Sequence, residues 1–244
     1  MTRFEPLPFE PGYRRVAAAI AARILDRSLR EGDPLPAETE LAEQFAVNRS
    51  TVREALRELE SADLVARRRG SKRMVITRPA SERMAGRFGQ SLALNDVTVR
   101  EVWRTLELIE PSLAAEAARA ADEQAITRLQ AAVDHFGADH ADAAAAVAGV
   151  ADFFRAVAAA TGNRVVALTQ EPLLLLLLAG LEIMIDQAPQ ARRRIATAQQ
   201  HICAAIRTHD ADTARDWMSR HIRDFRRGFE VSGIDLDSPV AAPR

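Results

Sequence analysis

The sequence has little cysteine, no apolar run long enough to span a membrane and no signal-peptide pattern, and each of these absences narrows the possible folds or cellular locations. Cys203 is the only cysteine, so no disulfide can form within the chain. The longest apolar run, Leu173 to Leu181, is much shorter than the roughly 18 residues that span a bilayer. We interpret it as a buried helix and expect no membrane contact. The first fifteen residues hold acids and three prolines where a signal peptide would have a basic and then an apolar stretch, so we expect a cytoplasmic protein.

Alternating apolar and polar residues, which would predict strands, are missing after residue 97. Helical patterns follow one another there with short breaks. They cover residues 97–120, 122–137, 140–161, 163–187, 190–209 and 211–230. Such a series predicts an all-helical antiparallel bundle. With 244 residues, the chain is long enough for a second domain in front of this bundle.

The net charge of −1 conceals an asymmetry along the chain. Residues 11–78 hold 14 basic against 10 acidic side chains, whereas the remainder holds 19 against 24. The basic excess is most visible in the segment ARRRGSKRMVITR, which ends at Arg78. An excess of this kind suits a polyanionic partner, although a solvated charged surface would look similar.

Three helices are predicted in this first region. The first helix has one apolar face and ends at the breaker REGDPLP. A second, short helix follows, and Asn48 is a suitable N-cap for a third. The apolar stripe of the third helix consists of Val52, Ala55, Leu56 and Leu59. Two short helices joined by a tight turn, behind a first helix, form a helix-turn-helix unit.

Two short β-prone runs follow the third helix. Leu64-Val65 and residues 74–76 flank a Gly-Ser turn that is rich in arginine and lysine. They predict a two-stranded wing, and hence a winged helix-turn-helix domain that places its third helix in the major groove of DNA.

Arg49, Arg53 and Arg57 share one line on the third helix. Arg57 is expected to pair with glutamates at helical spacing, as a surface residue would. Arg49 and Arg53 lie in the first turns, where the positive end of the helix dipole disfavours cations. We therefore expect these two to contact DNA, together with Ser50 and Thr51.

Residues 32–70, GDPLPAETELAEQFAVNRSTVREALRELESADLVARRRG, resemble the GntR superfamily of bacterial transcription regulators. The series of helices behind this head is similar to the FadR-like branch with an FCD effector-binding domain. The resemblance implies DNA contacts at Thr39, Arg49, Ser50, Thr51, Arg53, Arg69 and Gly70. Two residues depart from the family pattern, because members often have Arg in place of Thr39 and Ser or Thr in place of Asn48. The preferred operator is therefore expected to differ from the commonest one.

The FCD resemblance also implies a pocket inside the bundle, often with a divalent metal held by one Asp and three His. With Gly162-Asn163 as the register, the first two ligand positions hold Val150 and Phe154, whereas His201 and His221 match the other two. Two donors leave a metal site incomplete. We expect no metal and no required cofactor.

The same pocket is expected to be apolar. Leu106 stands where the family often has an effector-binding Arg, and Glu110 points inward from the same stripe. We predict a pocket formed by Leu106, Glu110, Val150, Phe154, His201 and His221. It would take an apolar or acyl-bearing effector, or no ligand, because burying unpaired polar groups is costly.

The predicted architecture is mainly α, with a winged helix-turn-helix domain followed by an FCD-like bundle. Its parts are an N-terminal tail at 1–10, the DNA-binding domain at 11–78, a linker with a short helix at 79–96, the effector-binding and dimerisation domain at 97–231, and a loose tail at 232–244. The expected function is a homodimeric repressor on an inverted-repeat operator in double-stranded DNA. An enzyme that uses Glu110, His201 and His221 is the alternative, but the chain has no nucleophile motif and no glycine-rich phosphate loop. A protein-binding scaffold is a second alternative.

Overall fold

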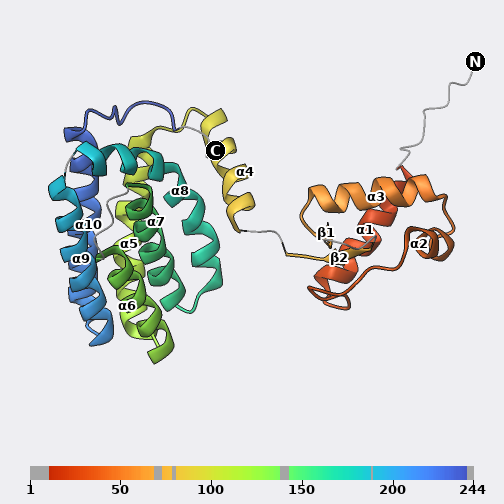
Figure 1. The fold of residues 1–244 in the computed structure, drawn as a ribbon, viewed down its shortest axis with the longest axis horizontal. Helices are drawn as coiled ribbons and strands as arrows, with labels where there is room; N and C mark the ends of the chain where they lie inside the picture. Colours follow the sequence, from red (N-terminus) through yellow and green to blue (C-terminus); the bar gives the residue numbers. More distant parts are fainter. Residues whose placement is uncertain (1–10, 69–72, 79–80, 138–142, 188, 241–244) are drawn as a thin grey trace, which may run out of the picture. The chain divides into compact units, whose positions relative to one another are not determined.

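The computed structural model describes residues 11–68, 73–78, 81–137, 143–187 and 189–240 (Figure 1). The chain divides into two compact units, residues 1–80 and 81–244. Each unit has its own hydrophobic core. The mainly helical architecture with a small wing, predicted from the sequence, is confirmed. The elements of the first unit are α1 Gly12–Leu25, α2 Glu38–Gln44, α3 Arg49–Ser61, β1 Val65–Arg67 and β2 Met74–Ile76.

The core of the first unit lies between α1 and α3, which pack against each other. The four apolar residues of the predicted α3 stripe are all buried. Residues from α1, α2 and the wing complete this core, among them Val16, Ile20, Leu41, Val65 and Ile76.

A tight turn joins α2 to α3. Ala46 adopts a positive φ of 52°, and the Val47 N–H donates to the carbonyl of Ala42 at 3.0 Å. The Asn48 side chain then accepts the Thr51 N–H at 2.8 Å, so Asn48 is the N-cap that the sequence predicts.

The wing is an antiparallel pair in which Val65 faces Ile76 and Arg67 faces Met74. The segment before α2 extends this pairing, because Leu35 N–H donates to the Met74 carbonyl at 2.8 Å. Pro34 forms an isolated bridge with Val75 on the same side. The wing is thereby attached to the helical core of the unit.

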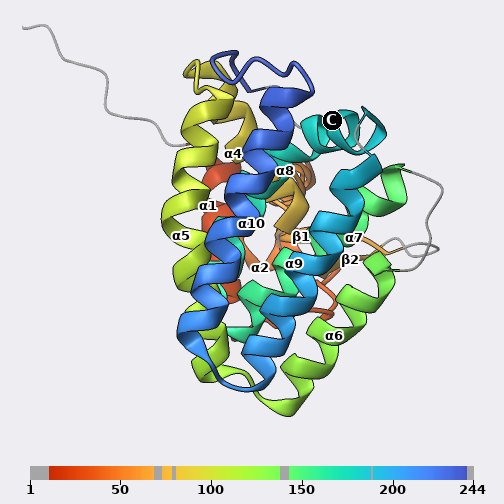
Figure 2. The same cartoon turned by 90° about the vertical axis from the view of Figure 1, so that its left-hand side faces the viewer.

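Seven helices of the second unit lie within the described residues. They are α4 Ser81–Leu94, α5 Val99–Ala120, α6 Glu123–Gly137, α7 Ala143–Ala160, α8 Arg164–Gln187, α9 Pro189–Arg207 and α10 Ala211–Val231. In Figure 2, α5, α10, α9 and α6 lie side by side, and α7 packs between α6 and α8. The predicted bundle is present, and α5 to α10 agree with the predicted helices to within three residues at each end.

Residues 79–96 were predicted to be a linker with a short helix, and α4 is a helix in this segment that packs against α8. Another segment differs from the sequence prediction. Residues 234–240, which were expected to be a loose tail, pack on the start of α5. Leu236 and Val240 are buried, Val240 N–H donates to the Val97 carbonyl at 2.8 Å, and Asp237 pairs with Arg100 at 2.6 Å. Helical or strand periodicity could not reveal this segment, because it is irregular and its contacts are with residues far away in the sequence.

One helix, α7, is long and apolar enough to cross a membrane by composition alone, and a bent pair within α8 is a second such candidate. In this structure α7 packs against α5, α6 and α8, and its apolar side chains belong to the core of the second unit. Its composition is therefore explained by its central place in the bundle.

Candidate functional site

Most of the predicted DNA-contacting residues that the structure describes lie at the start of α3, and Thr39 lies in α2. Arg49, Ser50 and Arg53 are exposed, whereas Thr51 and Thr39 are half-buried. The hydroxyls of Ser50 and Thr51 both donate to Asn48 Oδ1, each at 2.7 Å. In this state the two hydroxyls can accept hydrogen bonds but have no free donor for a phosphate oxygen.

The three arginines of α3 have different surroundings. Arg53 pairs with Glu38 of α2 at 3.3 Å, and the two side chains are 58% and 36% exposed. Arg49 has no ion-pair partner among the described residues. Arg57 has none either, so its expected pairing with Glu54, Glu58 or Glu60 is wrong here; solvent screening makes such surface pairs worth little.

The wing contributes further exposed cations to the same unit. Arg67 and Arg68 are exposed at the end of β1. Arg69 and Gly70, the two predicted contact residues of the wing, lie outside the described residues.

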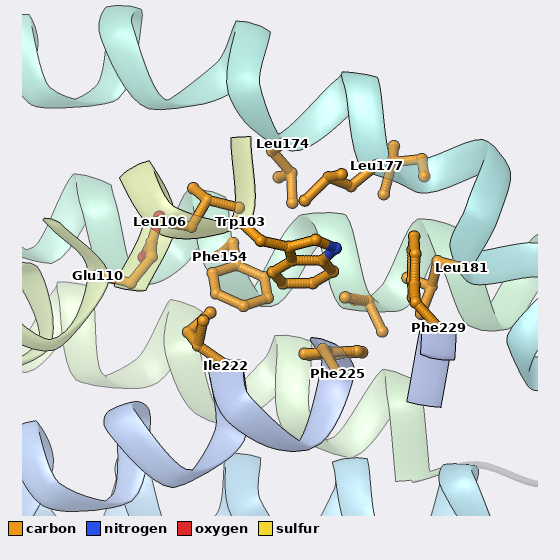
Figure 3. Close-up of a pocket in the computed structure, with 12 residues that line it drawn as sticks. Trp103, Leu106, Glu110, Phe154, Leu174, Leu177, Leu181, Ile222, Phe225 and Phe229 are labelled. Atoms are coloured by element: carbon orange, nitrogen blue, oxygen red, sulfur yellow. The ribbon is translucent and has the colours of Figure 1, made fainter. Parts of the chain in front are cut away.

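An apolar cavity of about 20 Å³ lies inside the bundle among α5, α7, α8 and α10 (Figure 3). Four of the predicted pocket residues, Leu106, Glu110, Val150 and Phe154, line it. The other lining residues are apolar or aromatic: Trp103, Leu174, Leu177, Leu178, Leu181, Ile222, Phe225 and Phe229. The space suffices for about one water-sized molecule, so a larger ligand would require side chains to move.

Among the described residues, Glu110 contributes the only carboxyl group to this cavity wall. Its Oε1 accepts a hydrogen bond from Gln170 Nε2 at 2.9 Å, and Oε2 has no partner among the described residues. Burial raises the pKa of Glu110 to about 7, although the Gln170 hydrogen bond lowers it. Near neutral pH a large part of the Glu110 population is therefore the uncharged acid.

His221 is buried but lies behind the cavity wall. Its ring stacks on Phe154 and contacts Phe225, with centroids 5.8 and 4.5 Å apart. Nε2 has no hydrogen-bond partner among the described residues. Burial lowers the pKa of His221 to about 3, so the ring is neutral at physiological pH.

His201 is not where the sequence analysis placed it. Its side chain is exposed and stacks on Trp217 with centroids 3.9 Å apart, away from the apolar cavity. The buried polar residue of α9 is Gln199, whose two amide atoms both lack a partner among the described residues. The apolar stripe of Ile195, Ile202 and Ile206 could have identified Gln199, because that residue lies on the same helical face.

The donors present do not fit a metal site of the kind that the FCD resemblance implies. Val150 and Phe154 offer no ligand atom, and His201 is exposed and stacks on Trp217, whereas His221 is buried. Within the described residues, no group of three or more His, Cys, Asp or Glu side chains could hold a metal ion. Divalent metals bound by proteins generally need more donors than this set provides.

Comparison with known proteins agrees with this geometry. Residues 12–75 match the gntR family of bacterial regulatory proteins, and residues 101–224, about half of the chain, match the FCD domain. The chain is 29% identical over 236 residues to the HTH-type transcriptional repressor NanR of Escherichia coli strain K12, covering 95% of this chain and 89% of NanR.

A second curated relative is the Uxu operon regulator of Haemophilus influenzae, 29% identical over 246 residues, covering 91% of this chain and 84% of that protein. The structure of a Streptococcus agalactiae GntR protein shares the fold, with a TM-score of 0.64 at 23% identity over 88% of this chain and 99% of that chain. With a DNA-binding head and a helical regulatory domain that each match their family model, this chain belongs to the GntR family of bacterial transcription regulators, which are not enzymes, in the branch that carries an FCD domain.

Proposed function

We propose that this regulator is a cytoplasmic repressor that binds an inverted-repeat operator as a homodimer. The observation that carries the proposal is Arg49, exposed at the start of the second helix of the helix-turn-helix and without an ion-pair partner among the described residues. A two-fold symmetric dimer presents two such helices to major grooves one helical turn apart. NanR, which is similar over most of this chain, is itself named a repressor.

Arg49 and Arg53 are the residues proposed to contact DNA most strongly. A guanidinium group binds phosphate oxygens, or O6 and N7 of guanine, in a bidentate manner. Arg53 would have to leave Glu38, but an exposed pair of this kind is worth at most about 1 kcal/mol. Thr39, Ser50, Thr51, Arg69 and Gly70 are proposed as additional contacts, on the basis of the family resemblance.

The effector is proposed to be an apolar or acyl-bearing molecule that enters the cavity of Figure 3. Apart from Glu110 and the Trp103 indole N–H, the lining offers only apolar surface. Trp103 Nε1 and Glu110 Oε2 both lack partners among the described residues. A carbonyl or hydroxyl group on an otherwise apolar ligand could accept from the indole and bond with the uncharged carboxyl group.

Effector binding would regulate the operator through a shift between two conformations of the dimer. Because the cavity holds only about one water-sized molecule, a ligand must stabilise an expanded arrangement of α5, α8 and α10. If that arrangement holds the two heads at a spacing unsuited to the operator, the ligand weakens DNA binding. The operator must then weaken effector binding by the same factor.

Gel shifts on the promoter region of the protein's own operon test the DNA-binding part. Arg49→Ala and Arg53→Ala should each lower the affinity by about 1–3 kcal/mol for a base contact, or reduce the salt dependence by about one charge for a phosphate contact. Arg128→Ala, which removes an exposed arginine from α6, is the matched control and should bind normally. Unchanged affinity in both α3 variants would refute the proposed interface.

Tryptophan fluorescence tests the effector part. The chain has two tryptophans, and in a Trp217→Phe variant only Trp103, on the cavity wall, remains. Medium-chain fatty acids and acyl-CoA compounds should change the Trp103 emission in a saturable manner. A response of Trp103 to small hydroxy acids alone would show that the cavity takes polar ligands and would overturn the apolar assignment.

A further inference from the structure

A second recess, with a volume of about 270 Å³, lies between α9 and α10. We call it the α9–α10 groove. Its polar and aromatic lining consists of Arg193, Arg194, Thr197, Trp217, Arg220 and Asp224. The volume is close to the lower end of the ~300–1,000 Å³ that small-molecule pockets usually have, so the groove suits a small metabolite.

The groove contains more positive than negative charge. Three guanidinium groups face a single carboxylate, and Asp224 lies 3.9 Å from Arg194. Arg193 and Arg220 have no ion-pair partner among the described residues. Two cations in one recess repel each other, and an anion placed between them would remove this repulsion.

Arg220 is already held in position before any ligand binds. Its guanidinium carbon lies 5.3 Å from the centre of the Trp217 ring, within cation–π distance. The Trp217 ring stacks in turn on His201, at 3.9 Å between centroids and an angle of 6°. Because this stack restricts the arginine, less conformational entropy is lost when Arg220 binds a ligand.

His221 adds a buried polar atom to the same groove. The residue is 2% exposed, lines the groove, and has no partner for Nε2 among the described residues. A buried polar atom without a partner costs about 1–3 kcal/mol. In the tautomer with a proton on Nε2, the neutral ring can donate a hydrogen bond to an oxygen of a bound ligand.

We propose that the α9–α10 groove binds a small organic anion through its phosphate or carboxylate groups. Arg193 and Arg220 bind the charged oxygens, Thr197 supplies a hydroxyl donor, and His221 donates from the base of the groove. Guanidinium groups bind both phosphate and carboxylate oxygens in a bidentate geometry. This site is chemically opposite to the apolar cavity and does not depend on the proposed repressor function.

Fluorescence of Trp217 tests the proposal in the full-length chain. A Trp103→Phe variant leaves Trp217 as the only tryptophan. Inorganic phosphate represents the phosphate source and citrate the carboxylate source, each compared with sodium chloride at equal ionic strength. At least one of the two anions should change the Trp217 emission in a saturable manner. The anion with the lower dissociation constant shows whether the groove prefers phosphate or carboxylate groups.

Variants of the groove arginines decide whether the signal comes from this site. Arg193→Ala combined with Arg220→Ala should raise the dissociation constant at least about tenfold, or 1.4 kcal/mol. Arg207→Ala, which removes an exposed arginine from the other end of α9, should change it less than about twofold, as expected for a screened charge. The proposal would be overturned if the double variant and the Arg207→Ala control changed the dissociation constant equally, or if neither anion changed the Trp217 emission.

A second measurement does not require the replacement of Trp103, which could disturb the fold. Isothermal titration calorimetry of the unmodified chain with the same anions should give one site per chain, which disappears in the double arginine variant while circular dichroism remains unchanged. Anion binding that persists in the double variant would assign the site elsewhere. DNA binding is not measured in either assay, so this outcome leaves the repressor proposal unaffected.

Discussion

The imidazole ring of His221 stacks on the phenyl ring of Phe154 at an angle of 9°, with centroids 5.8 Å apart. Phe154 lines the apolar cavity, whereas His221 lines the cationic α9–α10 groove. The two buried rings therefore form the wall between two sites of opposite chemistry. Because both rings belong to the same packed core, a ligand that displaces one of them must disturb the other.

His221→Phe should make the folded protein less sensitive to acid. Burial lowers the pKa of His221 from 6.5 to about 3, so between these values the folded state binds fewer protons than the unfolded state. The free energy of unfolding then falls as the pH decreases from 6.5 towards 3, by about 2 kcal/mol between pH 7 and pH 5. Phenylalanine cannot titrate. Urea denaturation at both pH values should show a smaller difference in the variant, and an unchanged difference would contradict the assignment.

Glu110→Gln should have the opposite effect on pH dependence. Burial raises the pKa of Glu110 from 4.5 to about 7, so the folded state keeps a proton that the unfolded state loses. The stabilisation is complete below pH 4.5 and is lost as the pH rises through 7, by about 2–3 kcal/mol between pH 5 and pH 8. Glutamine removes this loss and retains a partner for Gln170. The difference between the denaturation curves of variant and parent isolates the effect of Glu110 from that of His221.

Gln199→Leu should raise the free energy of unfolding by about 1–2 kcal/mol, because an apolar side chain of similar volume replaces a buried amide that has no partner among the described residues. Gln200→Leu is the control on the adjacent, exposed position and should change stability by less than about 0.5 kcal/mol. Thermal denaturation of the three proteins measures both effects. A less stable Gln199→Leu variant would indicate that the amide has a partner, such as a buried water molecule.

Gly180→Ala should destabilise the second unit by about 1–3 kcal/mol, because the added methyl group would collide with the Phe229 ring where α8 approaches α10. Gly86→Ala is the matched control. Gly86 lies in α4, and apart from its chain neighbours and its own helix backbone no described atom lies within 4 Å of the added methyl group, so alanine should stabilise the helix by about 0.5–1 kcal/mol. Chemical denaturation should therefore give a lower free energy of unfolding for Gly180→Ala and a higher one for Gly86→Ala. If both variants were destabilised, the collision with Phe229 would not be the specific cause.

Glu38→Gln should tighten operator binding about two- to fivefold. The substitution frees Arg53 from a pair that is worth up to about 1 kcal/mol and removes a negative charge from the proposed DNA surface. Glu60→Gln removes the same charge at the far end of α3 and should have a smaller effect. Equal gains from both variants in quantitative gel shifts would mean that only net charge matters.

The amino-acid sequence by itself determined the elements and their order. Apolar residues at helical spacing identified α1, α3 and the bundle helices, and Asn48 marked the start of α3, because periodicity and capping depend on neighbours within a few residues. The inward direction of Glu110 followed from the same local pattern. The character of the cavity was likewise predictable, since Leu106, Val150 and Phe154 lie on the inner faces of their helices.

Only the tertiary structure decided which partners these elements meet. In the folded chain His201 is exposed and Gln199 is buried. Residues 234–240 pack against α5, and Arg53 pairs with Glu38, which lies fifteen residues away in the sequence. The tertiary structure also formed the α9–α10 groove, which brings Arg193 and Arg194 of α9 together with Arg220 and Asp224 of α10, more than twenty positions further along the chain. Such contacts depend on how whole helices are placed relative to one another. Rotating a helix about its axis by a fraction of a turn would exchange buried for exposed residues, although the sequence of the helix would be the same.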